Sequence, residues 1–230
     1  MSGYCPSCGN TLCVCKEIEQ EEKALANATK YPPVLDACCG SRMFWFDRKD
    51  IRAVFVDKRQ ERHTLPDVSS AGGARELVID PDHVADFTAI PFPNDTFALV
   101  VFDPPHFERN GARSWVGLKY GTLSGDWTEM LRAGFAECFR VLRPEGTLIF
   151  KWCADEIPVS RILALTPERP LFGHKSGKNS KTHWIAFLKP NSAKKAIHAP
   201  DCAVALNARH ACSCGQDGGD AMKHGKQRNG

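Results

Sequence analysis

Short continuous apolar runs recur along the chain, and several of them end at a proline or an acidic residue. Runs of this length, rich in valine and phenylalanine, are typical of strands buried on both faces of a sheet. The clearest is Phe97–Phe102, because Pro104 and Pro105 follow it and cannot continue a strand ladder. The other runs predict a short strand that begins at Val34 and further strands at residues 53–56, 147–152, 171–174 and 184–188.

Helical periodicity appears in fewer places. Asp126 is a favourable N-cap, and apolar residues then recur at helical spacing, which predicts a helix that ends at Leu142. We expect its apolar positions in the core rather than in a site; they are Met130, Leu131, Phe135, Cys138 and Phe139. A short exposed helix is predicted over residues 17–30, and an apolar helix is expected to begin before Phe46.

These patterns divide the chain into a cysteine-rich N-terminus (1–16), a linker helix (17–31), a globular body (32–190) and a tail without periodicity (191–230), which we expect to be mostly disordered. A chain of 230 residues with 43% hydrophobic content suits one domain plus appendages. Six Lys or Arg and three Asp of the tail account for the net charge of +3, so the body is neutral. A neutral body argues against a strongly basic, DNA-coating surface.

No apolar run reaches the roughly 18 residues that a membrane span needs, and the N-terminus is polar. We therefore expect a soluble, cytoplasmic protein without a membrane partner. The eleven cysteines are odd in number, which favours reduced thiols over a disulfide framework. Cys5, Cys8, Cys13 and Cys15 supply enough thiolates for one tetrahedral zinc ion, and a reduced tail is the alternative.

Several acidic residues follow predicted strands. A tight turn of small residues leads to Gly40 after the first strand, and Asp57 ends the second. A strand–turn–helix lets the backbone approach a ligand closely, and an acid at the end of the next strand can hold both hydroxyls of a ribose. Asp86 and Phe87 precede the turn into the strand of Phe97–Phe102, where they could hold the edge and face of an adenine.

Asp103 ends the clearest strand and begins the motif Asp103-Pro104-Pro105-His106. In open α/β sheets, ligands bind at the carboxyl ends of the strands. A carboxylate oxygen and the carbonyl between two prolines are fixed acceptors that suit both hydrogens of an exocyclic amino group, and the ring that follows could stack on the base. A simple strand-ending turn is the alternative interpretation.

The order of these motifs resembles the class I, Rossmann-like S-adenosylmethionine-dependent methyltransferases. The resemblance extends to residues 138–150, which look like the helix, the L-[RK]-P-x-G turn and the fifth strand of that fold. Residues 36–47 together with D-P-P-H are also similar to small phage- and prophage-type methyltransferases. The resemblance implies an α/β fold with a Rossmann-like, doubly wound, mostly parallel sheet and a closing antiparallel hairpin.

The resemblance also implies roles for individual residues. The cofactor contacts would be Asp36, Ala37, Cys38, Gly40, Asp57, Asp86 and Phe87. The catalytic group would be Asp103, Pro104, Pro105 and His106, with His106 as a stacking or orienting residue. The first motif departs from the family, since Gly40 is its one glycine; Arg42 could then reach the carboxylate of the cofactor's methionine.

A long segment without regular pattern, residues 107–125, follows this motif. Aromatic and basic residues between glycines suit a lid that stacks bases and meets phosphates, although they could equally pin the loop to the body. The substrate candidates are Phe107, Arg113, Trp115, Lys119 and, on a neighbouring strand, Lys151. Lys151 could meet a phosphate or pair with a carboxylate.

The leading hypothesis is methyl transfer from S-adenosylmethionine to an exocyclic amino group of a DNA or RNA base, with adenine N6 as the favoured target. No separate target-recognition domain is visible in the sequence, so a partner or the lid would supply sequence specificity to a monomeric enzyme. One alternative is methylation of a small molecule or a protein. Another is a zinc-stabilised nucleic-acid-binding module with a degenerate Rossmann body.

Overall fold

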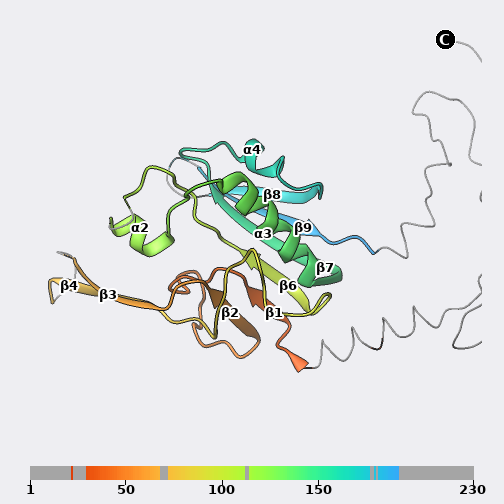
Figure 1. The fold of residues 1–230 in the computed structure, drawn as a ribbon, viewed down its shortest axis with the longest axis horizontal. Helices are drawn as coiled ribbons and strands as arrows, with labels where there is room; N and C mark the ends of the chain where they lie inside the picture. The colour runs from red at the N-terminus through yellow and green to blue at the C-terminus, as the bar shows by residue number, and fades with distance from the viewer. Residues whose placement is uncertain are drawn as a thin grey trace, which may run out of the picture. The chain divides into compact units, whose positions relative to one another are not determined.

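The computed structural model describes residues 22, 30–67, 72–111, 114–176, 179 and 181–191. Their central feature is a seven-stranded sheet with the order β5-β2-β1-β6-β7-β9-β8 (Figure 1). The strands are β1 (Val34–Asp36), β2 (Ala53–Asp57), β5 (His83–Val84), β6 (Phe97–Phe102), β7 (Leu142–Cys153), β8 (Pro170–Ser176) and β9 (Thr182–Leu188). The first five strands in this order are parallel, and β9 is antiparallel to both of its neighbours. The predicted mostly parallel sheet and closing antiparallel hairpin are confirmed.

The chain reverses its direction of travel across the sheet between β1 and β6. From β1 it proceeds outward to β2 and β5, and it then returns to form β6 and β7 on the other side. This reversal is a topological switch point, where loops diverge and leave a crevice at the carboxyl ends of the strands. The apolar composition of β2 and β6 matches their central position, since every residue of β2 is buried.

One face of the sheet is covered by α3 (Trp127–Val141). The Asp126 carboxylate caps this helix by accepting from the backbone N–H of Glu129 at 3.1 Å, as the sequence predicts, although the helix ends one residue before Leu142. Gly134 permits close packing, because a Cβ there would lie 2.7 Å from the ring of Phe87 and 2.8 Å from that of Phe102. This face carries the larger hydrophobic core of the described residues.

The opposite face differs from the doubly wound expectation, because residues 37–52 form turns and contain no helix. The predicted apolar helix before Phe46 is therefore wrong. Gly40 and Arg42 both have left-handed backbones, with φ of 51° and 54°, which interrupt any helix at its start. The side chain of Arg42 then holds the irregular path by donating to the carbonyls of Arg48 and Asp80.

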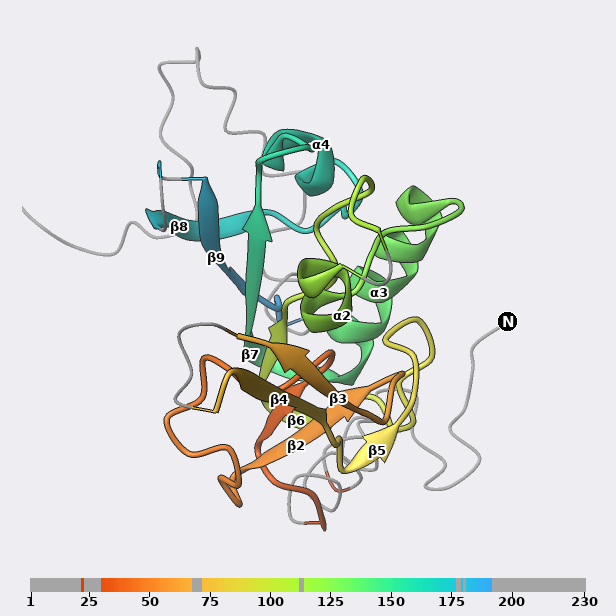
Figure 2. The ribbon, with the colours of Figure 1, turned by 90° about the vertical axis from the view of Figure 1, so that its left-hand side faces the viewer.

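Three elements between the sheet strands, and the two-residue strand β5 itself, are absent from the sequence prediction. The antiparallel hairpin of β3 (Glu61–Pro66) and β4 (Ala74–Ile79) projects from the end of β2, as Figures 1 and 2 show. The segment 107–125, predicted to be irregular, contains the short helix α2 (Trp115–Tyr120). A second short helix, α4 (Val159–Leu163), follows β7.

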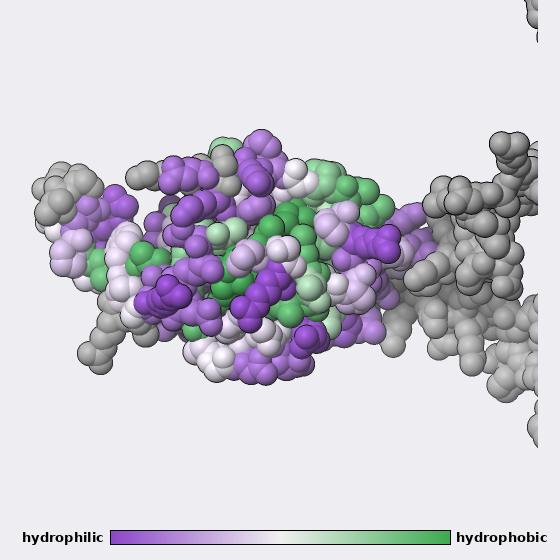
Figure 3. All heavy atoms as spheres, turned by 90° about the horizontal axis from the view of Figure 1, so that it is seen from above, coloured by the Kyte–Doolittle hydropathy of each residue, from purple (hydrophilic) through white to green (hydrophobic). Residues whose placement is uncertain are grey.

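β8 is an exposed edge strand. Leu171 and Phe172 are 63% and 68% exposed, and Figure 3, which views the molecule from the side of α4 and β8, shows hydrophobic residues reaching the surface among hydrophilic ones. None of the helices within the described ranges is long and apolar enough to cross a membrane.

Several predictions fall outside the described residues. They concern Cys5, Cys8, Cys13 and Cys15, the lid residue Arg113, and the tail beyond Asn191. Within the predicted linker helix, the described residues Glu22 and Lys30 are helical.

Candidate active site

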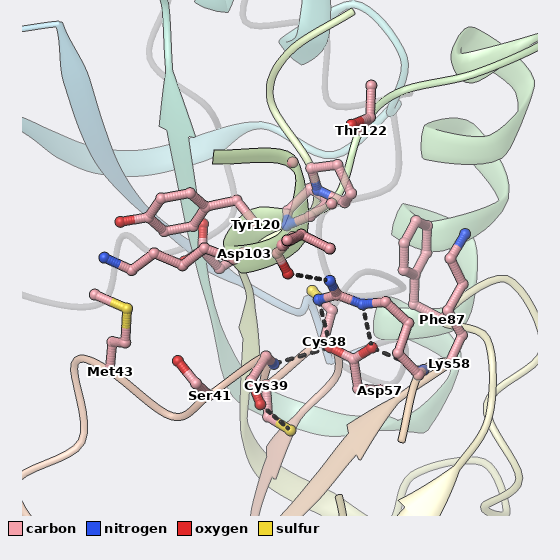
Figure 4. Close-up of a pocket in the computed structure, with 18 of the residues that line it drawn as sticks. Cys38, Cys39, Ser41, Met43, Asp57, Lys58, Phe87, Asp103, Tyr120 and Thr122 are labelled. Atoms are coloured by element: carbon pink, nitrogen blue, oxygen red, sulfur yellow. Dashed lines mark hydrogen bonds and ion pairs between the residues drawn. The ribbon is translucent and has the colours of Figure 1, made fainter. Parts of the chain in front are cut away.

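A cavity of about 630 Å³ opens at the carboxyl ends of the parallel strands, at the switch point between β1 and β6. The turn after β1, the end of β2, the motif after β6, the segment around α2 and one residue of β7 form its walls. Figure 4 shows Ser41 and Met43 at one end of the cavity and Lys58 and Phe87 at the other. The lining residues predicted from the sequence are Cys38, Gly40, Asp57, Phe87, Asp103, Pro104, Pro105, Lys119 and Lys151.

Asp57 is the last residue of β2, and its carboxylate is almost completely buried. Backbone N–H groups of Gly40 and Arg59 each donate to it at 2.9 Å. The Arg59 side chain adds two longer contacts, from Nε to Oδ1 at 3.1 Å and from Nη2 to Oδ2 at 3.4 Å. Each oxygen of this carboxylate therefore has two donors.

Asp103 follows β6 and has a different environment. Lys151 Nζ donates to Oδ2 at 2.6 Å, so of the two roles foreseen for Lys151 the structure shows the pairing with a carboxylate. Oδ1 lies 2.9 Å from His106 Nε2, but this contact lacks hydrogen-bond geometry, and Oδ1 is a buried acceptor without a donor among the described residues. Burial would raise the pKa of Asp103, but the contacts with His106 and Lys151 outweigh it and hold the pKa below its usual value.

His106 is buried behind this carboxylate. It is 4% exposed, its ring packs edge-on against Trp152 with centroids 4.9 Å apart, and it does not line the cavity. Stacking of His106 on a bound base is therefore incompatible with the structure, whereas a role in orienting Asp103 is compatible. Phe44, Phe87 and Tyr120 are the aromatic residues that line the cavity.

Asp36 and Ala37 form the floor beneath the turn after β1, and neither lines the cavity. The Asp36 carboxylate accepts from Trp45 Nε1 at 2.8 Å. Burial raises the pKa of Asp36 to about 7, and the Trp45 hydrogen bond offsets part of that rise. Burial likewise raises the pKa of Cys38, which lines the cavity as a neutral, small side chain.

Four other candidates from the sequence lie outside the cavity wall. The Asp86 carboxylate accepts from the backbone N–H and hydroxyl of Thr88 and lies 3.9 Å from Lys58, so it caps its own turn. Arg42 stacks on Phe55, pairs with Asp82 and does not line the cavity. Phe107 and Trp115 also do not line the cavity, although Trp115 is 37% exposed on α2.

α2 closes over the cavity. A Cβ on Gly40 would lie 3.7 Å from the carbonyl oxygen of Lys119, and a Cβ on Gly121 would lie 3.0 Å from Pro105. Sequence reasoning missed the contribution of Arg59 and Phe44 to this site. The position of Arg59, two residues after a strand-ending acid, was the one signal that pointed to it.

Within the described ranges, no cluster of three or more His, Cys, Asp or Glu residues could hold a metal ion. The cavity itself has buried carboxylates and closely approaching backbone in its walls.

Comparisons with known proteins give structural likenesses alone. No protein-family description matches the chain, and no curated protein sequence matches it. The PH0226 protein from Pyrococcus horikoshii OT3 shares 18% identity at a TM-score of 0.44, over 76% of this chain and 90% of that one. The N-methyltransferase NodS from Bradyrhizobium japonicum WM9 shares 13% identity at a TM-score of 0.41, over 76% and 97%.

A third similar structure is the W203A mutant of the 16S rRNA (adenine(1408)-N(1))-methyltransferase from Catenulisporales acidiphilia. It shares 10% identity at a TM-score of 0.39, over 74% of this chain and 92% of that one. Identities and scores this low assign no function.

Proposed function

We propose that the protein is an S-adenosylmethionine-dependent methyltransferase that methylates an exocyclic amino group of a nucleic-acid base, with adenine N6 as the first candidate. The observation that carries this proposal is the Asp103 carboxylate in the cavity wall, which is fixed by Lys151 at one oxygen, lies 2.9 Å from His106 Nε2 at the other, and is held ionised by these two neighbours. A fixed, ionised carboxylate is a strong acceptor for an N–H of a bound amine.

The cavity fits the cofactor. Its volume of about 630 Å³ lies in the range of small-molecule sites. Gly40 brings backbone close to the ligand, Asp57 stands where ribose hydroxyls would bind, and the ring of Phe87 lines the far end, where it could face an adenine. When bound, S-adenosylmethionine would supply a methyl group activated for nucleophilic attack.

The residues at the acceptor end would orient and stabilise the amine. The Asp103 carboxylate and the Pro104 carbonyl would accept its two hydrogens and so direct the nitrogen lone pair toward the methyl group. A pKa held below the usual value keeps Asp103 ionised, and its charge balances the positive charge that develops on the nitrogen. A carboxylate of low basicity is a poor proton acceptor, so the product would lose its proton to water.

The aromatic and basic residues of α2 favour a nucleic acid as the acceptor. Lys119 Nζ lies 5.4 Å from the ring of Trp115 and 5.0 Å from that of Tyr120. Lys58, on the other side of the cavity, is 49% exposed. A stacking surface beside cations is the arrangement that single-stranded nucleic acids bind. Sequence specificity would come from this segment or from a partner protein.

The test is transfer of a tritiated methyl group from S-adenosylmethionine to separate pools of DNA, RNA and small molecules, followed by mass spectrometry of the nucleosides. We expect label in a nucleic-acid pool at an exocyclic amine, and none with Asp103→Ala. Label confined to small molecules would refute the nucleic-acid substrate, and failure to bind the cofactor in a calorimetric titration would refute the enzyme altogether.

A further inference from the structure

Arg59 occupies part of the site that the proposed function assigns to a ligand. A carboxylate has about four acceptor positions. On Asp57, the backbone N–H groups of Gly40 and Arg59 fill two of them at 2.9 Å. Nε and Nη2 of the Arg59 side chain fill the other two, at 3.1 Å and 3.4 Å. Asp57 therefore has no acceptor position left for ribose hydroxyls while the guanidinium is in place.

The same guanidinium holds α2 over the cavity. Arg59 Nη1 donates to the carbonyl oxygen of Leu118 at 2.9 Å, its shortest side-chain hydrogen bond. The segment that follows α2 packs against the motif Asp103-Pro104-Pro105-His106. The contact is close, since Gly121 has no room for a side chain against Pro105. Arg59 thus links the Asp57 carboxylate, which is assigned to the cofactor, to α2, which covers the part of the cavity assigned to the methyl acceptor.

We propose that Arg59 is a positioning residue that competes with the ribose hydroxyls for Asp57 and couples cofactor binding to the release of α2. The inference rests on the proposed function, because it takes Asp57 as the ribose acid. The side-chain contacts to Asp57 are longer than the backbone contacts, so the guanidinium is the partner that hydroxyls would displace. The backbone N–H groups would keep the carboxylate oriented during the exchange.

Displacement of the guanidinium would also end its hydrogen bond to Leu118. α2 would then lose its tie to the cofactor end, and the cavity wall at Pro105 would become accessible to the acceptor. The cofactor would therefore bind first and the acceptor second.

A purely structural role for Arg59 predicts the opposite sign in a binding experiment. If Arg59 only neutralises Asp57, its removal leaves a buried carboxylate without a counter-charge, and the cofactor turn should loosen and bind less tightly. If Arg59 competes, its removal leaves two unfilled acceptor positions that ribose hydroxyls would satisfy, and the ligand should bind more tightly.

The experiment is a calorimetric titration of S-adenosylhomocysteine into the wild type, Arg59→Gln and the control Arg62→Gln. Arg62 is 65% exposed, pairs with Glu76 and does not line the cavity. The substitution Arg62→Gln therefore removes an equal positive charge close to Arg59 in the sequence. We expect affinity about threefold to tenfold tighter for Arg59→Gln, the value of displaced hydrogen bonds, and unchanged for Arg62→Gln. Arg59→Lys, which keeps the charge but not the fork of donors, should fall between wild type and Arg59→Gln.

Amide hydrogen exchange over residues 115–120 supplies the second readout. S-adenosylhomocysteine should accelerate exchange in the wild type, whereas Arg59→Gln should exchange quickly with or without it. Weaker binding by both Arg59 variants, or an α2 whose exchange ignores the ligand in the wild type, would overturn the role of Arg59. A wild type that binds no S-adenosylhomocysteine would instead overturn the proposed function, and this inference with it.

Discussion

Asp57 and Asp103 stand at the carboxyl ends of β2 and β6, the two strands that flank β1, and both line one cavity, but their oxygens have different partners. Two donors meet each oxygen of Asp57, two of the four contacts coming from the movable side chain of Arg59. Asp103 has one oxygen on Lys151 and one buried oxygen that lies 2.9 Å from His106 Nε2. The first arrangement suits a ligand that replaces existing donors, and the second holds an ionised carboxylate in a fixed position.

The strongest test of this difference is Asp103→Asn. The amide keeps the size of the side chain but removes the charge that balances the attacked nitrogen, so turnover should fall by roughly 10²–10³, on the order of 3–4 kcal/mol. S-adenosylhomocysteine affinity should stay close to wild type, since Asp103 is assigned to the acceptor. Initial rates and calorimetry on the same preparation check both points, and turnover within a few-fold of wild type would rule out the amino-methylation mechanism.

The complementary change is Asp57→Ala. It should weaken cofactor binding by about 1–3 kcal/mol through the loss of charge-assisted hydrogen bonds. Asp86→Asn is the matched control, because Asp86 also follows a strand but caps its own turn outside the cavity wall. Calorimetry should show little change for Asp86→Asn. Equal losses in both variants would mean that Asp57 is no more than a structural acid.

Lys151→Met examines why Asp103 stays ionised. Because the pKa of Asp103 is lowered, activity should be lost as the pH falls through that pKa, and removal of Lys151 should move the loss to higher pH. If the pKa of Asp103 rises by one unit, the rate at a pH below that pKa falls about tenfold, and the rate well above it changes little. The control is Lys189→Met, which breaks the Lys189–Asp95 pair of 2.7 Å elsewhere in the molecule. Superimposable pH–rate profiles for Lys151→Met and wild type would contradict the assigned role of Lys151.

The smallest expected effect concerns Asp36, a third carboxylate that is buried below the cavity. Its pKa of about 7 in the folded state lies above the ordinary 3.8, so the folded protein should lose stability as the pH rises between those values and remain less stable above them. Asp36→Asn, which mimics the protonated form and can still accept from Trp45, should therefore stabilise the protein by about 1–2 kcal/mol at pH 8. Below pH 3.8, where Asp36 is protonated in the folded and the unfolded state, it should match wild type in chemical denaturation. Equal stability of the two proteins at both pH values would show that Asp36 titrates normally.

The sequence by itself determined every strand of the sheet except β5, together with the places of the strand-end acids. Continuous apolar runs such as Phe97–Phe102 must be buried on both faces, and parallel strands bring their carboxyl ends to one edge. Asp57 and Asp103 could therefore be placed in one cavity from the sequence. The helix cap at Asp126 could also be predicted, because capping depends on residues close together in the chain.

Only the tertiary structure decided which groups these acids meet. Lys151 and Asp103 are 48 positions apart, and Arg59 reaches Leu118 across 59, so their pairing depends on how distant segments pack. The path of residues 37–52 could not be predicted either, because Arg42 fixes it by donating to the carbonyl of Asp80, on a loop far away in the sequence. His106 lies behind Asp103 for the same reason, since Trp152 on β7 packs against its ring. Apolar periodicity encodes which residues are buried, whereas the partner of a polar side chain is set by packing between elements far apart in the chain.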